Sequence, residues 1–526
     1  MPLWRSNACR RKNDFSGEIM ADIAAVISIA SEGVYLNISE SKSGIVKRLE
    51  FLFQPLSIGQ DTFNEGRISF KKVDKICKIL ENYRQLMRDY AVKKVKVVGT
   101  TALREATNIT FILDQIKSKT NFDVLVLDDP QEKSIIYKAM LLRINNSEFI
   151  NNRLFLGYIG TGSLGIAICK DRKITYSQNV RIGSVKLLEI LKSFQTDSEN
   201  TYHIINEYLS SFVKTIKTIP NIDQVEHFIT CGQEIENMIK MTGEYTKNNF
   251  QAIPVKTITD LFDKIKTNTP EQIGRKFKLP DYDLESLLPS MGIYKMFFDI
   301  VKVSTIISVP VKLSEAILLE MFSNKDYLEI SEVFAESTVI SAKNLGMRFL
   351  YDEEHANQVE KLSLILFDLL KIKHRLEKRY RLLLQLSAIL HDIGKFIQLK
   401  NHSQHSANII RGTELLGLDQ RETEIVALVA KYHSTKFLLS DDINLQKMEP
   451  ADRLIIAKLL AILRIADALD RSHASKVKDI KLQMKSRKLR LKILSDQRIM
   501  LEKWSIETKS EFFEDVFGLK PEIIKE

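Results

Sequence analysis

Histidines are concentrated in the C-terminal part of the chain. Nine occur among the 526 residues, and seven of them lie at or after position 355. Their clustering matters because neutral imidazole is the commonest side-chain ligand for metal ions. The pair His391-Asp392 follows the apolar run Leu382–Leu390, so a nitrogen and a carboxylate are expected to face one side of a cavity. Asp467 lies within the apolar run Leu459–Leu469, where a carboxylate needs a metal or an arginine as its partner.

The order and helical setting of these residues resemble a known pattern. His355, the pair His391-Asp392 and Asp467 match the successive motifs of the HD superfamily of metal-dependent phosphohydrolases. The resemblance implies that all four side chains bind a divalent ion and that Asp392 takes part in catalysis. Such an ion polarises a phosphoryl oxygen and acidifies bound water. The alternative is a remnant of the HD fold, whose histidines lie in the core and bind no metal.

Further histidines and basic residues lie between these motifs. His402, His405 and His433 stand at positions like those where some HD members hold a second metal or contact phosphate. Lys395 and Arg411 could also bind phosphate, but exposed helix positions explain them equally well. Sites built from His and Asp accept Mn, Mg or Fe, and also Zn, to different degrees, so the sequence leaves the metal open.

Strand-like and helix-like runs alternate through the N-terminal half. Ile23–Ile29 and Val34–Ile38, joined by a short turn, predict a hairpin, and Lys72–Tyr90 has apolar residues at helical spacing. The pattern restarts at Leu154–Ile159, where the turn Thr161-Gly162-Ser163 leads into another strand. Two units that open alike predict a duplicated α/β core with a cleft between its halves, and two unrelated α/β domains are the alternative.

The C-terminal half has a different character. Residues 314–474 consist almost entirely of amphipathic helix patterns, and Ile480–Leu482 and Leu489–Leu494 then predict strands before a closing helix at Glu511–Phe517. We therefore expect an N-terminal tail (1–19), a first α/β half (20–145), a second α/β half (146–318), a helical HD domain (319–475) and a small α+β tail (476–526).

Composition and charge narrow the classes of protein. No run approaches the roughly 20 apolar residues of a membrane helix, and the start of the chain lacks the apolar core of a secretory signal. Four scattered cysteines fit a reducing cytoplasm, where we expect the protein to reside. The net charge of +10 permits a polyanionic partner, although solvated lysines and arginines explain most of it. The sequence has no recognised nucleic-acid motif, so we expect no nucleic-acid partner.

Four N-terminal segments resemble one family. Residues 97–108 (VVGTTALREATN), 131–137 (QEKSIIY), 158–165 (YIGTGSLG) and 180–187 (VRIGSVKL) are similar to segments of the exopolyphosphatase / guanosine pentaphosphate phosphatase family, Ppx/GppA. This family commonly carries an HD-like domain behind its N-terminal half. The resemblance implies a duplicated actin/sugar-kinase/Hsp70-like (ribonuclease H-like) core. It also implies removal of terminal phosphates from polyphosphate or guanosine pentaphosphate, and a homodimer.

Several family positions have lost their usual side chains. Ser28, Tyr158 and Gly165 stand where the family has metal-associated carboxylates, and Tyr35 stands where it has arginine. Phosphoanhydride hydrolysis depends mostly on positioning and charge neutralisation. Replacing three carboxylates removes the groups that would hold the neutralising metal, so we expect this cleft to be a poor catalyst.

Other family positions are retained. Glu132 matches the family's catalytic base, and Arg104 matches a residue that contacts phosphate. Gly160, Gly162 and Ser163 preserve a loop whose backbone N–H groups could bind an anion. For Glu132 the alternative is an ordinary carboxylate stabilised by a helix N-terminus.

Asp128 and Asp129 leave a further choice open. They could be substitute metal ligands, but a solvated turn is the favoured interpretation.

These observations lead to one main hypothesis and two rivals. The main hypothesis is a Ppx/GppA-like phosphohydrolase acting on polyphosphate, guanosine pentaphosphate or a related compound. In it the HD site is the centre of catalysis and the N-terminal cleft serves for docking or sensing. The first rival is a sensor that binds polyphosphate or a guanosine nucleotide without catalysis. The second is a retained exopolyphosphatase in which Glu132 is the base and Asp128 or Glu32 compensates.

Overall fold

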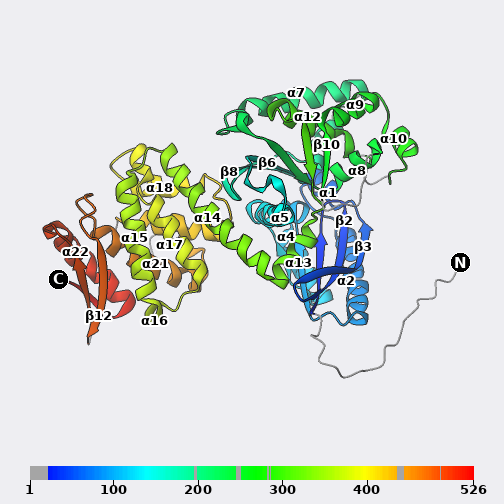
Figure 1. The fold of residues 1–526 in the computed structure, drawn as a ribbon. Helices are drawn as coiled ribbons and strands as arrows, with labels where there is room; N and C mark the ends of the chain where they lie inside the picture. Colours follow the sequence, from blue (N-terminus) through cyan, green and yellow to red (C-terminus); the bar gives the residue numbers. More distant parts are fainter. Residues whose placement is uncertain are drawn as a thin grey trace.

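The structure is a computed structural model. It describes residues 22–192, 194, 198–243, 250–280, 284, 286–434, 443–485 and 487–525, so the expected tail at 1–19 lies outside the described residues. An α/β core occupies one side of the molecule and a helical domain lies beside it (Figure 1). A small C-terminal sheet packs on the far side of the helical domain. No helix among these residues is long and apolar enough to cross a membrane.

The first half of the core is a five-stranded sheet in the order β3-β2-β1-β4-β5. Its strands are β1 (Asp22–Ile29), β2 (Gly33–Lys42), β3 (Ile45–Pro55), β4 (Lys94–Gly99) and β5 (Val124–Val126). Its helices are α1 (Ile58–Glu65), α2 (Phe70–Asp89), α3 (Thr101–Arg104), α4 (Ile109–Thr120) and α5 (Asp129–Ile144). The central strand β1 reads as one apolar run because both of its faces are covered, and residues 24–29 are all buried.

The second half repeats this plan with six strands in the order β10-β11-β9-β6-β7-β8. Its strands are β6 (Leu154–Ile159), β7 (Leu164–Lys170), β8 (Lys173–Val180), β9 (His227–Cys231), β10 (Gln251–Pro254) and β11 (Thr305–Ser308). Its helices are η1 (Glu148–Asn151), α6 (Ser184–Lys192), α7 (Ser198–Ile216), η2 (Ile222–Gln224), α8 (Gln233–Thr242), α9 (Val255–Ile265), α10 (Pro270–Phe277) and α12 (Leu287–Ile300). Each half opens with an antiparallel meander of three strands, followed by a parallel strand beside the first, so the core is a duplicated unit as expected.

Two helices connect the core to the helical domain. Helix α13 (Leu313–Phe322) runs across the expected domain division at residue 318 and packs against β1 of the first sheet. Helix α14 (Lys325–Arg348) then contacts both β8 and the helical domain. The remaining helices, apart from α16, share one apolar core. They are α15 (Glu353–Leu369), α16 (Lys371–His374), α17 (Lys378–Leu390), η3 (Ile393–Phe396), α18 (His402–Arg411), α19 (Gln420–Tyr432), α20 (Ile443–Gln446) and α21 (Pro450–Ala468).

The C-terminal segment adds a three-stranded sheet and one helix. Strands β12 (Asp479–Lys485) and β13 (Lys488–Leu494) form a hairpin, and β14 (Lys520–Lys525) pairs in parallel with β13. Helix α22 (Met500–Phe517) lies between them in the sequence and packs on α21. The helix therefore begins before the expected Glu511 and does not close the chain, because a parallel third strand needs a crossover helix before it.

Candidate functional site

Six side chains of the helical domain converge on one buried site. His355 lies in the first turn of α15, His391 and Asp392 directly follow α17, and Asp467 lies near the end of α21. His402 begins α18 and His433 directly follows α19. All but His402 are at least nine-tenths buried. The two expected groups of histidines, with Asp392 and Asp467, thus come together in a single cluster.

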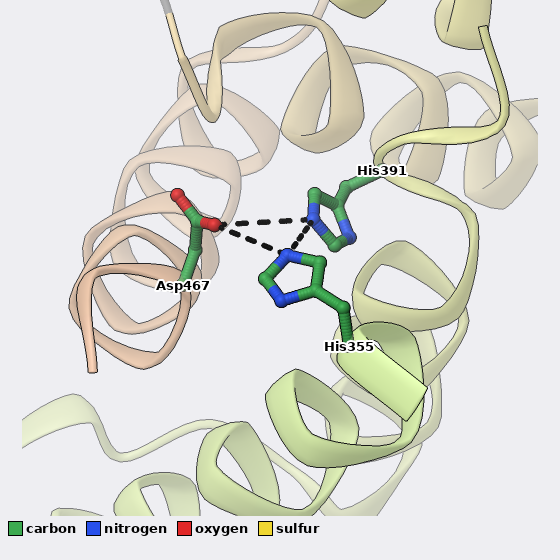
Figure 2. A group of neighbouring side chains, drawn as sticks. All are labelled: His355, His391 and Asp467. Carbon is green, nitrogen blue, oxygen red and sulfur yellow. Dashed lines mark hydrogen bonds and ion pairs between the residues drawn. The ribbon is translucent and has the colours of Figure 1, made fainter. Parts of the chain in front are cut away.

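One side of the cluster is drawn in Figure 2. His355 Nε2 lies 3.3 Å from His391 Nε2 and 3.5 Å from Asp467 Oδ1, and the three side chains point toward a common centre. Asp392 Oδ2 lies 3.5 Å from His391 Nε2 and 3.9 Å from His355 Nε2. Two nitrogens and two carboxylate oxygens therefore surround one small volume.

The other side of the cluster uses the second oxygen of the same carboxylate. Asp392 Oδ1 lies 3.2 Å from His402 Nε2 and 3.4 Å from His433 Nε2. These two nitrogens are 3.4 Å apart. Asp392 is therefore shared between a pair formed by His355 and His391 and a pair formed by His402 and His433.

Backbone carbonyls fix the tautomers of three of these histidines. Nδ1 of His391, His402 and His433 lies 2.8, 3.0 and 2.7 Å from the carbonyl oxygens of Ala388, Leu399 and Ala430, respectively. A carbonyl oxygen only accepts hydrogen bonds, so each Nδ1 carries a proton and donates it. In a neutral ring the facing Nε2 then presents a lone pair, as metal-ligating histidines do.

Electrostatics sets the charge of the cluster. Burial lowers the pKa of His391 to about 4, which keeps this ring neutral at pH 7. Burial also opposes charge on His355, but hydrogen bonds to Asp467 and Asp470 outweigh it and raise the pKa to about 9. Burial raises the pKa of Asp392, but the positive charge that His391 carries when protonated, together with His402 and His433, lowers it to well below its usual range. Lys509 and His355 likewise lower the pKa of Asp467 against the effect of burial.

These donors fit a divalent ion. The atom Asp392 Oδ1 is buried and has no hydrogen-bond partner among the described residues, although two imidazole nitrogens face it. A divalent ion between these atoms would satisfy the lone pairs on both sides. A proton on His402 is the alternative, because its contact with Asp392 raises the pKa of this ring. Two lysines supply part of the positive charge. Lys395 Nζ lies 2.5 Å from Asp392 Oδ2, and Lys509 Nζ contacts the outer oxygen of Asp467.

A glycine and a hydrogen bond bring α18 to the cluster. A Cβ atom at Gly394 would collide with the backbone carbonyl of His402, so only glycine allows this approach. The Gly394 N–H also donates to Ser406 Oγ at 2.9 Å. The glycine after His391-Asp392 is therefore needed to position His402.

Other residues singled out in the sequence lie elsewhere. His405 is on the same helix as His402, but within the described ranges it has no hydrogen bond or ion pair with the cluster. Arg411 forms a bidentate ion pair with Glu424, at 2.7 and 2.8 Å.

Sequence reasoning missed two partners of His355. Asp470 Oδ2 lies 2.8 Å from His355 Nδ1, and the ring of His473 stacks on that of His355 at 3.7 Å between centroids. Helix α21 ends at Ala468, so Asp470 and His473 lie beyond it and share no helix face with Asp467. Their closeness to Asp467 in the sequence was the available signal.

In the N-terminal cleft, the residues that match the family contact other side chains of the protein. A cavity of about 150 Å³ between the two halves is lined by Ser28, Glu32, Glu132, Tyr158 and Gly160, among others. Tyr158, in place of a family carboxylate, donates a hydrogen bond to Glu132 Oε1 at 3.3 Å. Burial and the Glu132 charge raise the pKa of Tyr158 well above its usual value, so the hydroxyl stays protonated.

The cationic groups of this cleft already have partners. Arg104 is 2.6 Å from Asp129 Oδ1 and also donates to the Leu127 carbonyl. The buried Lys133 Nζ donates to Ser163 Oγ at 2.8 Å, and Ser163 Oγ donates to Asp129 Oδ1 at 2.9 Å. Arg104 and Ser163, both expected to bind phosphate, are therefore held by Asp129.

The phosphate loop is closely packed. A Cβ atom at Gly165 would lie 2.5 Å from the Tyr137 hydroxyl and 2.9 Å from Lys133 Cδ, so the space of the lost glutamate is filled. Gly160 N donates to the Ser163 carbonyl at 2.9 Å. A Cβ atom at Gly162 would collide with Thr101. The position of Gly165 thus has no room for the metal carboxylate that the family resemblance implies there, although Glu32, Glu132 and Glu234 still line the cavity.

Asp128 joins the cleft to the helical domain. Its Oδ1 accepts the Gln131 N–H at 2.8 Å and caps α5, and its Oδ2 accepts the Gln420 N–H at 2.8 Å. Gln131 Nε2 in turn donates to Asp419 Oδ2, the cap of α19, at 3.1 Å. These contacts favour the turn interpretation of Asp128 over a metal ligand.

Two parallel helices run from this contact to the histidine cluster. Arg379 at the start of α17 forms a bidentate ion pair with Glu422 at the start of α19. At the other ends of these helices the rings of His391 and His433 lie 4.8 Å apart. Each helix therefore connects the region beside the cleft with a histidine of the cluster.

Comparison with known proteins gives consistent matches along the chain. A family model described as the Ppx/GppA phosphatase family matches residues 37–325, and one described as Ppx/GppA phosphatase, domain III, matches residues 338–510. A guanosine-5'-triphosphate,3'-diphosphate pyrophosphatase of Photobacterium profundum is 22% identical over 458 residues, covering 84% of this chain and 87% of that protein. A protein of the same name from Pseudoalteromonas translucida is 22% identical over 428 residues, covering 78% and 80%.

Solved structures share the fold. The crystal structure of the Aquifex aeolicus member of the Ppx/GppA protein family matches with a TM-score of 0.50 and 22% identity, covering 58% of this chain and 98% of that one. An exopolyphosphatase from Cytophaga hutchinsonii matches with a TM-score of 0.52 and 18% identity, covering 57% and 98%.

Proposed function

The chain belongs to the Ppx/GppA phosphatase family, and on this premise we propose that it is a phosphohydrolase whose reaction takes place in the helical domain. The observation that carries the proposal is the convergence of four imidazole Nε2 atoms on the two oxygens of Asp392. Burying so many polar groups together costs free energy, and a bound cation would offset that cost. We infer polyphosphate, guanosine pentaphosphate or a related phosphoanhydride or phosphoester as the substrate, the second from the names of the relatives.

The proposed ligands divide into two sets that share Asp392. His355, His391 and Asp467 would hold one divalent ion, and His402 and His433 a second. Mn, Mg or Fe suits these nitrogen and oxygen donors. A divalent ion at this place supplies Lewis-acid polarisation of a phosphoryl oxygen and acidification of water.

The chain's own residues orient and neutralise the substrate. Lys395 contacts the Asp392 oxygen that faces His355 and His391, and Lys509 contacts the outer oxygen of Asp467. Both Nζ atoms can exchange a carboxylate for a phosphate oxygen. Asp470 and the backbone carbonyls hold the imidazole rings in place, so the donor atoms need little reorganisation.

For the N-terminal cleft we propose binding rather than hydrolysis. Glu132 is retained as a possible base, but Tyr158 donates to it and Arg104 is paired with Asp129. The contact of Asp128 with Gln420 supports a sensing role, because α17 and α19 lead from there to the cluster.

We expect long-chain polyphosphate to change the rate of hydrolysis at the helical site. Asp419→Ala removes the acceptor of the Gln131 contact between the cleft and α19, so it should remove that response. An unchanged response in this variant would contradict the link.

The experiment measures phosphate release with Mn or Mg from polyphosphate, guanosine pentaphosphate and the ring-free ester glycerol phosphate. Wild type, Asp392→Ala and Glu132→Gln are compared, and His405→Ala serves as a control from the same region. We expect Asp392→Ala to abolish release and Glu132→Gln to leave most of it.

Other outcomes of this experiment would favour a different catalytic site or no catalysis. Loss of release only in Glu132→Gln would make the N-terminal cleft the catalytic site. No release from any substrate by metal-loaded wild type would favour the alternative, a sensor without catalysis. Light scattering after gel filtration tests the homodimer that the family resemblance suggests, and a monomer mass would exclude it.

A further inference from the structure

A cavity opens directly above the histidine cluster. Its volume is about 520 Å³, which lies within the range of pockets that take small organic ligands. Asp392, His402, His433 and Asp467 form its floor. Its walls come from residues outside the cluster, and these residues determine what else the site could bind.

Three cations line the walls. Lys395 follows the cluster in sequence, Lys509 comes from α22, and Arg471 comes from the segment after α21. Arg471 is exposed and, within the described parts of the chain, makes no hydrogen bond or ion pair. A free guanidinium beside a metal-binding floor is suited to bidentate contact with a phosphate.

The mouth of the same cavity is apolar on two sides. Trp504 of α22 is 59% exposed and Leu399 is 77% exposed, and both line the cavity. Single exposed apolar side chains are ordinary, but those that border one cavity mark a surface for a ligand. An inorganic polyphosphate presents only charged oxygens and would leave both uncovered.

Helix α22 therefore adds two different contacts to the site. Trp504 and Lys509 are five positions apart on this helix, with Ser505 and Thr508 between them in the cavity wall. One end of the wall is aromatic and the other is cationic and close to Asp467. This order matches a molecule with a flat ring at one end and a phosphate at the other.

We propose that the helical site takes a nucleotide or a similar ring-bearing organic phosphate, with the ring against Trp504 and the phosphate at Arg471 and Lys509. Trp504 is then a specificity-determining residue that selects such esters over inorganic polyphosphate. The catalytic meaning of this preference rests on the proposed function, whereas the binding itself does not.

Intrinsic fluorescence gives a local measure of binding. The chain has two tryptophans, Trp4 and Trp504, so a Trp4→Phe background reports on Trp504 alone. Guanosine 5'-monophosphate, adenosine 5'-monophosphate and inorganic tripolyphosphate are titrated with Mg present, and calorimetry gives the dissociation constants. We expect both nucleotides to quench the signal at saturation and tripolyphosphate to leave it nearly unchanged.

Variants separate the ring contact from the phosphate contact. Trp504→Ala is expected to weaken nucleotide binding by about tenfold or more, as loss of a stacking aromatic does, while Trp504→Phe retains most of it. Arg471→Gln should weaken the binding of nucleotides and of inorganic tripolyphosphate alike. Met500→Ala, an exposed position of α22 outside the cavity wall, is the matched control and should change neither.

The outcomes distinguish this inference from the proposed function. If Trp504→Ala leaves nucleotide affinity unchanged, or if tripolyphosphate quenches as strongly as the nucleotides, the ring subsite is refuted. Hydrolysis of glycerol phosphate, which has no ring, depends only on the cluster. Its loss in Asp392→Ala would support the proposed function even if the ring subsite fails, and nucleotide quenching could persist if the proposed function fails.

Discussion

Removal of His402 tests whether the cluster holds two ions rather than one. His402 and His433 are the only imidazoles of the described chain within 3.5 Å of Asp392 Oδ1. His402→Ala leaves that side with one nitrogen and one shared oxygen, while His355, His391 and Asp467 remain intact. We therefore expect the metal content to fall from about two ions per chain to about one.

The size of the effect follows from the lost ligand. Changing a residue that merely orients a ligand costs about 10- to 100-fold in metal affinity. Removing the ligand itself should cost at least about 100-fold, or ~2.7 kcal/mol of binding free energy. Thermal unfolding of the helical domain should show the same loss, because an ion at 100 times its Kd stabilises the folded state by about that amount.

The assay pairs two variants on one helix. Wild type, His402→Ala and His405→Ala are loaded with Mn, freed of excess metal and analysed by elemental mass spectrometry and thermal shift. His405 lies one turn from His402 but outside the cluster, so His405→Ala should keep the wild-type content. Equal losses in both variants, or a wild type that retains at most one ion, would refute the two-sided cluster.

Three further predictions concern the pH dependence of stability, a steric clash at Gly165 and the N-terminal cap of α5. His374 Nε2 lies 2.8 Å from the Phe367 carbonyl and its Nδ1 accepts the N–H of Leu376, and burial lowers its pKa. The unfolded state therefore binds more protons, so stability should fall as pH drops below about 6.5; urea unfolding at several pH values should find a shallower slope in His374→Asn. Gly165→Glu restores the family's carboxylate but forces a Cβ onto the Tyr137 hydroxyl. It should cost about 1–3 kcal/mol of stability by urea unfolding and yield no gain in polyphosphate hydrolysis, whereas a gain would show that the site can still accept its metal. Asp128→Ala removes the cap of α5 and should cost about 1 kcal/mol, and equal stability to wild type in urea would contradict the capping role.

Local patterns were enough to predict the main elements of the core. The hairpin at Ile23–Ile29 and Val34–Ile38 is confirmed as β1 and β2, and Leu154–Ile159 is confirmed as β6. Strands β1 and β6 have nearly continuous apolar runs because both of their faces are buried. Strands β3 and β8 were not predicted, since each lies at a sheet edge with a mixed, partly exposed sequence.

The chemical character of the helical domain was also readable from the sequence. His355, His391-Asp392 and Asp467 are recognised by their residue types and by their order in the chain. Neither property depends on where a helix begins or ends. Their ligand roles remain predictions, which the metal analysis above tests.

Only the tertiary structure decided which further residues join them. His402 and His405 look alike in sequence, but the approach of α18 to Gly394 brings one to Asp392 and not the other. Likewise Trp504 and Lys509 reach the site because α22 packs on α21, a contact between segments that no local pattern encodes. The sequence determined the kinds of ligand present, since these depend on residue type alone. Their number and the cavity around them depend on long-range packing, which only the folded chain determines.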